Sequence, residues 1–157
     1  MVAQLDTKTV YTFMDSLISI KKYVETAKNL GYQTLGIMDI DNLYGAYYFM
    51  ETATEQGIQP LLGIEMTLDY TGFPLNLRFL ALDSQGYRNL MKLSTLKMIG
   101  KSKWEEFQHL LEGIAIIVPV FEGIEALDLG REFYIGVFPD TPKQAFSHAT
   151  LPLQTVR

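Results

Sequence analysis

The segment Leu35–Leu68 reads LGIMDIDNLYGAYYFMETATEQGIQPLLGIEMTL and decides the fold class of this chain. A short apolar strand at 34–38 is followed by a polar loop, a helix at 43–56 and a second apolar strand at 61–68. A glycine directly after the helix and a proline just before the second strand mark the ends of these elements. Two strands joined through a helix lie parallel in one sheet, so the segment predicts a β-α-β unit.

Two acidic residues lie on these strands. Asp39 comes where the first strand ends, and Glu65 lies on the second strand. Ligands of α/β proteins bind at strand ends and at the loops that follow them, so both residues are candidates for a functional site. A purely structural role is also open for each of the two residues. Asp39 would cap the helix that begins near Leu43, and Glu65 would pair with Lys8 or Arg78.

The alternation of strands and helices continues along the whole chain. Strands are expected at 2–5, 34–38, 61–68, 75–82, 114–118, 133–138 and 151–156, and helices near 20–30, 43–56, 84–98, 104–111, 124–129 and 142–148. This rhythm predicts an α/β fold with mainly parallel strands and crossover helices. A turn at 69–72 predicts that the strands at 61–68 and 75–82 form a hairpin. No linker or change in composition divides the chain, so 1–157 is expected to be a single domain.

Composition excludes several classes of protein. The 157 residues contain no cysteine, which rules out disulfides and thiolate metal sites and is compatible with the cytoplasm. The net charge of −5 argues against a direct nucleic-acid grip, and the sparse cluster Lys92, Lys97, Lys101 and Lys103 suits a solvated helix face. No signal-peptide pattern and no membrane-length apolar run is present, so no contact with a membrane is expected.

Four short motifs resemble one known family. These are YTFMD at 11–15, MDIDNLYGA at 38–46, GIE at 63–65 and ALDSQGYRNLMKL at 81–93. They are similar to the PHP (polymerase and histidinol phosphatase) domain found at the amino terminus of bacterial DNA polymerase III alpha subunits. The resemblance implies an incomplete, distorted (β/α) barrel of the PHP type. It also implies a piece of a longer replicative polymerase, and we expect a truncated chain because Arg157 ends directly after a strand-like run.

The resemblance further implies a metal site that has largely been lost. The family uses a cluster of metal ions, held mainly by imidazoles, to activate water. At the corresponding positions Asp15 and Glu65 are retained and Asp6 is a tolerable replacement. The diverged positions are Lys8, Ile40, Asn76, Val120, Thr155 and Arg157. No cofactor is therefore expected, or at most one weakly held Mg²⁺ or Mn²⁺.

Each candidate residue also has a structural interpretation. Lys8 would lie at a solvated strand end or fill the old site through an ion pair with a carboxylate, and Arg157 would neutralise the remaining carboxylates. Asp15 would act as a helix cap or dipole partner. The two histidines, His109 and His148, align with no family ligand and are expected at the surface.

These observations leave three functions open. The leading hypothesis is a structural and interaction module of a polymerase, inactive by itself, that contacts the remaining domains of the alpha subunit and other replisome subunits. The parent chain would then be a DNA-directed DNA polymerase. The second hypothesis is a metal-dependent phosphoesterase or pyrophosphatase that uses Asp6, Asp15 and Glu65. The third sets the resemblance aside and keeps a small α/β binding protein.

Overall fold

A computed structural model describes residues 3–121 and 124–136 of the chain. The strands are β1 (Ala3–Gln4), β2 (Thr34–Ile40), β3 (Gln59–Tyr70), β4 (Phe73–Ala81), β5 (Ile114–Pro119) and β6 (Tyr134–Gly136). The helices are α1 (Ile20–Asn29), α2 (Ala46–Glu55), α3 (Ser84–Met98) and α4 (Trp104–Phe107), with 3₁₀ turns η1 (Gln108–Leu110) and η2 (Ile124–Ala126). The helix expected at 142–148 and the strand expected at 151–156 lie outside the described residues.

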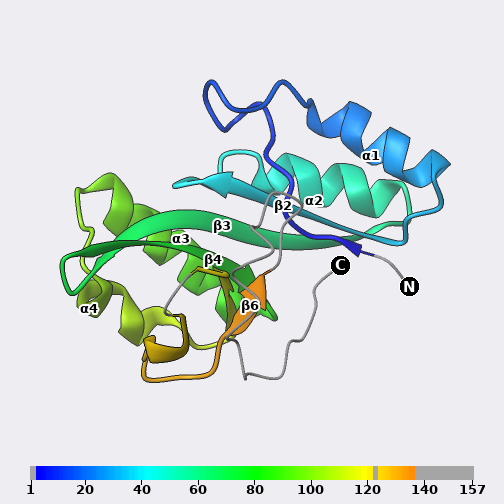
Figure 1. Cartoon of the computed structure of the whole chain (residues 1–157). Helices are drawn as coiled ribbons and strands as arrows, with labels where there is room; N and C mark the ends of the chain where they lie inside the picture. Colours follow the sequence, from blue (N-terminus) through cyan, green and yellow to red (C-terminus); the bar gives the residue numbers. More distant parts are fainter. Residues whose placement is uncertain (1–2, 122–123, 137–157) are drawn as a thin grey trace.

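The six strands form one curved sheet in the order β1-β2-β3-β4-β5-β6 (Figure 1). The pairs β1–β2, β2–β3 and β5–β6 are parallel, whereas β4 is antiparallel to both of its neighbours. The sheet is therefore mixed, and the expectation of mainly parallel strands is wrong. The α/β class and the β-α-β unit of β2, α2 and β3 are confirmed.

Two connections explain the antiparallel strand. Strand β3 reverses into β4 through Thr71 and Gly72, both at positive φ, which is the geometry of a tight hairpin turn. After β4, the chain runs along α3 to the hairpin end of the sheet, where the Asp69 amide donates to the Ser102 carbonyl at 2.7 Å. It then returns through α4 and η1, and the Leu82 amide bonds the Gly113 carbonyl at 2.9 Å. Strand β5 therefore starts beside the end of β4.

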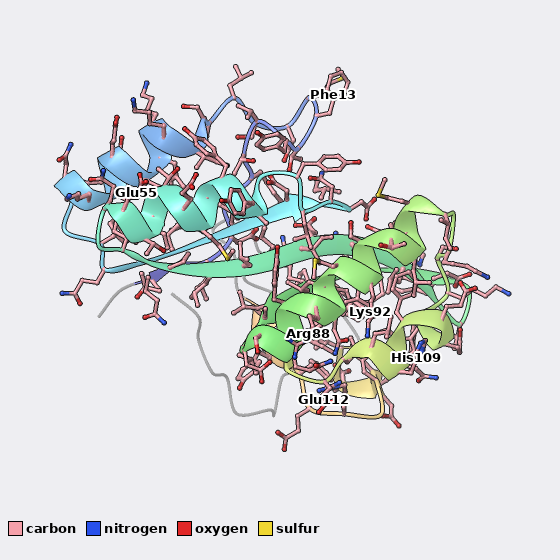
Figure 2. All side chains as sticks on the ribbon, turned by 180° about the vertical axis from the view of Figure 1, so that it is seen from behind. Phe13, Glu55, Arg88, Lys92, His109 and Glu112 are labelled. Atoms are coloured by element: carbon pink, nitrogen blue, oxygen red, sulfur yellow. The ribbon has the colours of Figure 1, made fainter. Side chains whose placement is uncertain are left out.

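The helices cover one face of the sheet. Figure 2 shows α1, α2 and α3 in front of the strands. Side chains alternate between the two faces of a strand, and Ile64, Met66 and Leu68 of β3 join the main core beneath the helices. The opposite, helix-free face carries a small second apolar cluster around Met38, Leu80 and Ala115. No helix within the described residues is long and apolar enough to cross a membrane.

Close packing fixes α3 against the sheet. Gly86 lies so near the Gly113 carbonyl that an added Cβ would fall 1.9 Å from its oxygen. The Asp83 side chain accepts a hydrogen bond from the Gly86 amide at 2.7 Å and so caps the helix.

A phenol ties α1 to the segment that follows β1. The Tyr23 hydroxyl donates to the Gly36 carbonyl and accepts from the Thr7 hydroxyl, both at 3.0 Å. The Thr7 carbonyl in turn accepts from the Met38 amide at 2.9 Å, which continues the contact of this irregular segment with β2. These hydrogen bonds hold residues 5–8 against the edge of β2, past the end of the two-residue strand β1.

Burial raises the pKa of Tyr23 to about 12, against a smaller lowering by the Thr7 hydroxyl. An unfolded chain releases this proton near pH 10, whereas the folded chain keeps it. The stability linked to this proton is therefore complete below about pH 10 and is lost as the pH rises towards 12. We predict that Tyr23→Phe lowers the free energy of unfolding by about 1 kcal/mol at pH 7, because two hydrogen bonds disappear.

The same variant should lose stability less steeply than the native chain above pH 10. Thermal unfolding followed by circular dichroism between pH 7 and pH 11 measures both effects. Parallel pH profiles for the two proteins would contradict the assignment of this phenol.

Candidate functional site

Four charged side chains meet on the helix-free face of the sheet. Glu65 of β3 and Arg78 of β4 are direct partners in the hairpin register, so their side chains point to the same face. Asp6 and Lys8 come from the segment after β1 and flank Thr7, whose carbonyl bonds β2. We call Asp6, Lys8, Glu65 and Arg78 the ion-pair cluster.

Each cation of the ion-pair cluster bridges both carboxylates. Lys8 Nζ lies 2.5 Å from Asp6 Oδ1 and 2.7 Å from Glu65 Oε2. Arg78 Nε lies 2.6 Å from Asp6 Oδ2, and its Nη2 lies 3.2 Å from Glu65 Oε2. The four side chains are between 11% and 19% exposed. The formal charges of this ring cancel in a largely desolvated place, where unpaired charges would be costly.

Asn76 extends the ion-pair cluster along β4. Its Nδ2 donates to Glu65 Oε1 at 2.9 Å, and its Oδ1 accepts from Arg78 Nη1 at 2.9 Å. A second, longer bond of 3.4 Å joins Nδ2 to the Thr67 hydroxyl. This diverged position therefore holds an amide that orients Glu65 and Arg78.

Asp39 has a different role from the one expected. It is 2% exposed and lies on the helix side of β2, together with Leu35 and Ile37. Its carboxylate accepts from the Thr9 amide and hydroxyl at 2.7 Å each, and from the Thr12 hydroxyl at 2.6 Å. The prediction that Asp39 caps the next helix is wrong, because alternation along β2 aims it at the loop before α1.

Among the described residues, Asp15 takes no part in the ion pairs of the ion-pair cluster. It is exposed in the loop before α1, and its amide donates to the Thr12 carbonyl at 3.3 Å. Helix α1 begins at Ile20 with Ser19 at its N-cap position, so Asp15 does not cap it. Within the described ranges, no group of three histidine, cysteine, aspartate or glutamate side chains is placed to hold a metal ion.

The remaining positions supply no metal ligand that the structure describes. Ile40 is 37% exposed at the end of β2, opposite Glu65. Val120 is buried and apolar. Thr155, Arg157 and His148 lie outside the described residues, whereas His109 is exposed on η1, as predicted.

The described residues at these positions do not fit an imidazole-held metal cluster. Asp6 and Glu65 are brought together, yet their oxygens face an ammonium and a guanidinium, which cannot ligate and which repel a cation. Sequence reasoning missed the three hydrogen bonds to Asp39. It named Arg78 as one alternative partner for Glu65, and the signal was the turn at Thr71 and Gly72, because that turn fixes the register that pairs the two residues.

Comparisons with known proteins agree with this architecture. The PHP domain model matches residues 4–136. The DNA polymerase III subunit alpha of Streptococcus pyogenes serotype M1 is 46% identical over 159 residues, covering 100% of this chain and 15% of that protein. The same subunit of Rickettsia bellii is 29% identical over 128 residues, covering 76% of this chain and 11% of the relative. The chain thus spans a small part of the length of these polymerase subunits.

Two solved structures share the fold at low sequence identity. A protein assigned as a metal-dependent phosphoesterase from Bifidobacterium adolescentis superposes with a TM-score of 0.55 at 12% identity, over 74% of this chain and 66% of its own. An amidohydrolase from Chromobacterium violaceum gives a TM-score of 0.56 at 11% identity, over 76% and 66%. The matched family model covers most of the described strands and helices, and the chain therefore belongs to the PHP domain family.

Proposed function

We propose that this chain is the amino-terminal PHP module of a bacterial replicative DNA polymerase alpha subunit and that it serves as a structural and interaction module. The parent would be a cytoplasmic, DNA-directed DNA polymerase, a nucleotidyltransferase that acts in DNA replication. Its polymerising site would lie in other domains. The module itself would be inactive, with its metal site largely lost.

The ion-pair cluster is the observation that carries this proposal. Water activation by metal ions needs ligands that are free to coordinate. Here Lys8 and Arg78 each contact both carboxylates at 3.2 Å or less. Lys8 and Arg78 would thus neutralise the carboxylates of the site, as bound metal ions would in an active relative. No cofactor is proposed, or at most one weakly held Mg²⁺ or Mn²⁺.

An apolar surface supports the interaction role. In the loop before α1, Phe13, Met14 and Leu17 are 89%, 91% and 97% exposed. Clustered exposed apolar side chains mark surfaces that contact other proteins or domains. The proposed partners are the remaining domains of the alpha subunit and other replisome subunits.

A metal-dependent phosphoesterase or pyrophosphatase is the second candidate. The observation that favours it is the convergence of Asp6 and Glu65 on one amine, Lys8 Nζ, at 2.5 and 2.7 Å. A rearrangement that withdrew Lys8 would leave two carboxylates within reach of one ion. The exposed Asp15 would have to move to join them.

Lys8→Ala tests the structural role of the ion-pair cluster. It leaves two largely buried carboxylates with one cation, and we predict a loss of about 3–5 kcal/mol of unfolding free energy. Lys101→Ala is the matched control, because Lys101 pairs with Glu106 at 2.7 Å while it is 49% exposed. The control should lose much less stability than Lys8→Ala, because solvent screens an exposed ion pair. Urea unfolding measures both variants, and equal small losses would contradict an internal role for Lys8.

Metal addition separates the two candidate functions. We predict that excess Mg²⁺, Mn²⁺ or Zn²⁺ leaves the melting temperature of the purified chain unchanged, because the carboxylates of the ion-pair cluster are already paired. Metal analysis after dialysis should find no stoichiometric ion. Stoichiometric metal, or stabilisation by several degrees together with hydrolysis of a phosphate ester, would instead favour the enzyme.

A further inference from the structure

A groove runs between α3 and η1 on the helix-covered side of the molecule. Its first wall is the stripe Arg88, Met91, Lys92 and Thr95, and its second wall carries His109 and Leu110. Figure 2 labels Arg88, Lys92 and His109 along this region. The stripe has helical spacing and spans two turns of α3, or about 10 Å. The groove has a volume of about 570 Å³.

The stripe is the outward face of an amphipathic helix. Helix α3 buries its other face, including Gly86, Leu90 and Leu93, against the sheet. Met91 nevertheless stays 43% exposed, and Leu96 at the floor and Leu110 on the second wall are partly buried. Covering this apolar floor with an apolar side chain of a ligand removes both surfaces from water and therefore favours binding.

The two permanent cations of the groove have neutral partners. Arg88 donates to Gln85 Oε1 at 2.8 and 3.2 Å, and Lys92 Nζ donates to Asn89 Oδ1 at 3.4 Å. Neither forms an ion pair with a residue that the structure describes, and no acidic residue lines the groove. Lys97 and Lys101 just beyond the groove both have carboxylate partners. On a chain of net charge −5, a local positive groove without acidic partners is complementary to an anionic ligand.

We propose that the groove between α3 and η1 binds a short acidic peptide segment of a partner protein, with carboxylates on Arg88 and Lys92 and an apolar side chain on the floor. The apolar floor and the small number of cations favour a peptide over nucleic acid, which needs a longer row of phosphate contacts. The inference deepens the interaction role and rests on the proposed function for the existence of a partner. The groove is separate from the ion-pair cluster, so each is tested by different variants.

The proposal is tested by selecting peptides from a random twelve-residue phage library on the immobilised 157-residue chain. The recovered peptides should be enriched in aspartate and glutamate around a leucine, isoleucine or phenylalanine. Binding of one labelled peptide is then measured by fluorescence anisotropy. Arg88→Glu combined with Lys92→Glu should weaken it by at least about tenfold, through the loss of two charge contacts and added repulsion. Met91→Ser should weaken it by a smaller factor.

Lys21→Glu combined with Lys22→Glu is the matched control, because both lysines are exposed on α1 and the change in charge is similar. It should leave peptide affinity within about twofold. Circular dichroism and melting curves establish that all variants fold. Peptides without acidic enrichment, or equal affinity for the groove and control variants, would overturn the proposal. So would tighter, groove-dependent binding of a thymidine oligonucleotide, or self-association of the chain that the groove variant abolishes.

Discussion

Two carboxylates on the helix-free face of the sheet must be neutralised, and much of the structure around them follows from this constraint. Glu65 faces Arg78 across the hairpin of β3 and β4, while Asp6 and Lys8 arrive from the segment after β1. The resulting ring joins the first residues of the chain to its central hairpin. Removing one member leaves an uncompensated charge that is largely shielded from water, so the four residues act as a unit.

Residues 3–19 contain little regular structure, and side-chain hydrogen bonds take the place of strand-to-strand backbone bonds there. Asp39 holds Thr9 and Thr12 through three hydrogen bonds, and Tyr23 holds Thr7 and Gly36. These buried contacts fix the segment that carries Asp6 and Lys8 against β2. The geometry of the ion-pair cluster therefore depends on residues that do not belong to it, which supports the view of the module as a scaffold.

Sequence patterns predicted the elements better than their pairing. The helix at 84–98 and the β-α-β unit follow from periodicity and glycine stops, and the structure confirms both. The hairpin of β3 and β4 was predicted and is confirmed. The antiparallel pairing of β4 with β5 was missed, because the chain runs along α3 and returns through α4 and η1 before β5 begins, which no local pattern reveals. For Lys8 the sequence left two alternatives open, a solvated side chain or an ion pair with a carboxylate. The burial of the side chain decides between them, and the sequence does not reveal that burial. Asp39 was misassigned because a strand end and a helix start adjoin it in sequence, whereas its partners lie about 30 residues away.

A double-mutant cycle on Lys8 and Glu65 tests most directly whether the ion-pair cluster stabilises the fold from within. Lys8→Met, Glu65→Gln and the double variant would be unfolded in urea at about 0.15 M and 1 M sodium chloride. We predict a coupling energy of at least about 1.5 kcal/mol that survives the higher salt, because the two side chains are 16% and 11% exposed. A coupling below about 0.5 kcal/mol, or one that high salt abolishes, would contradict it.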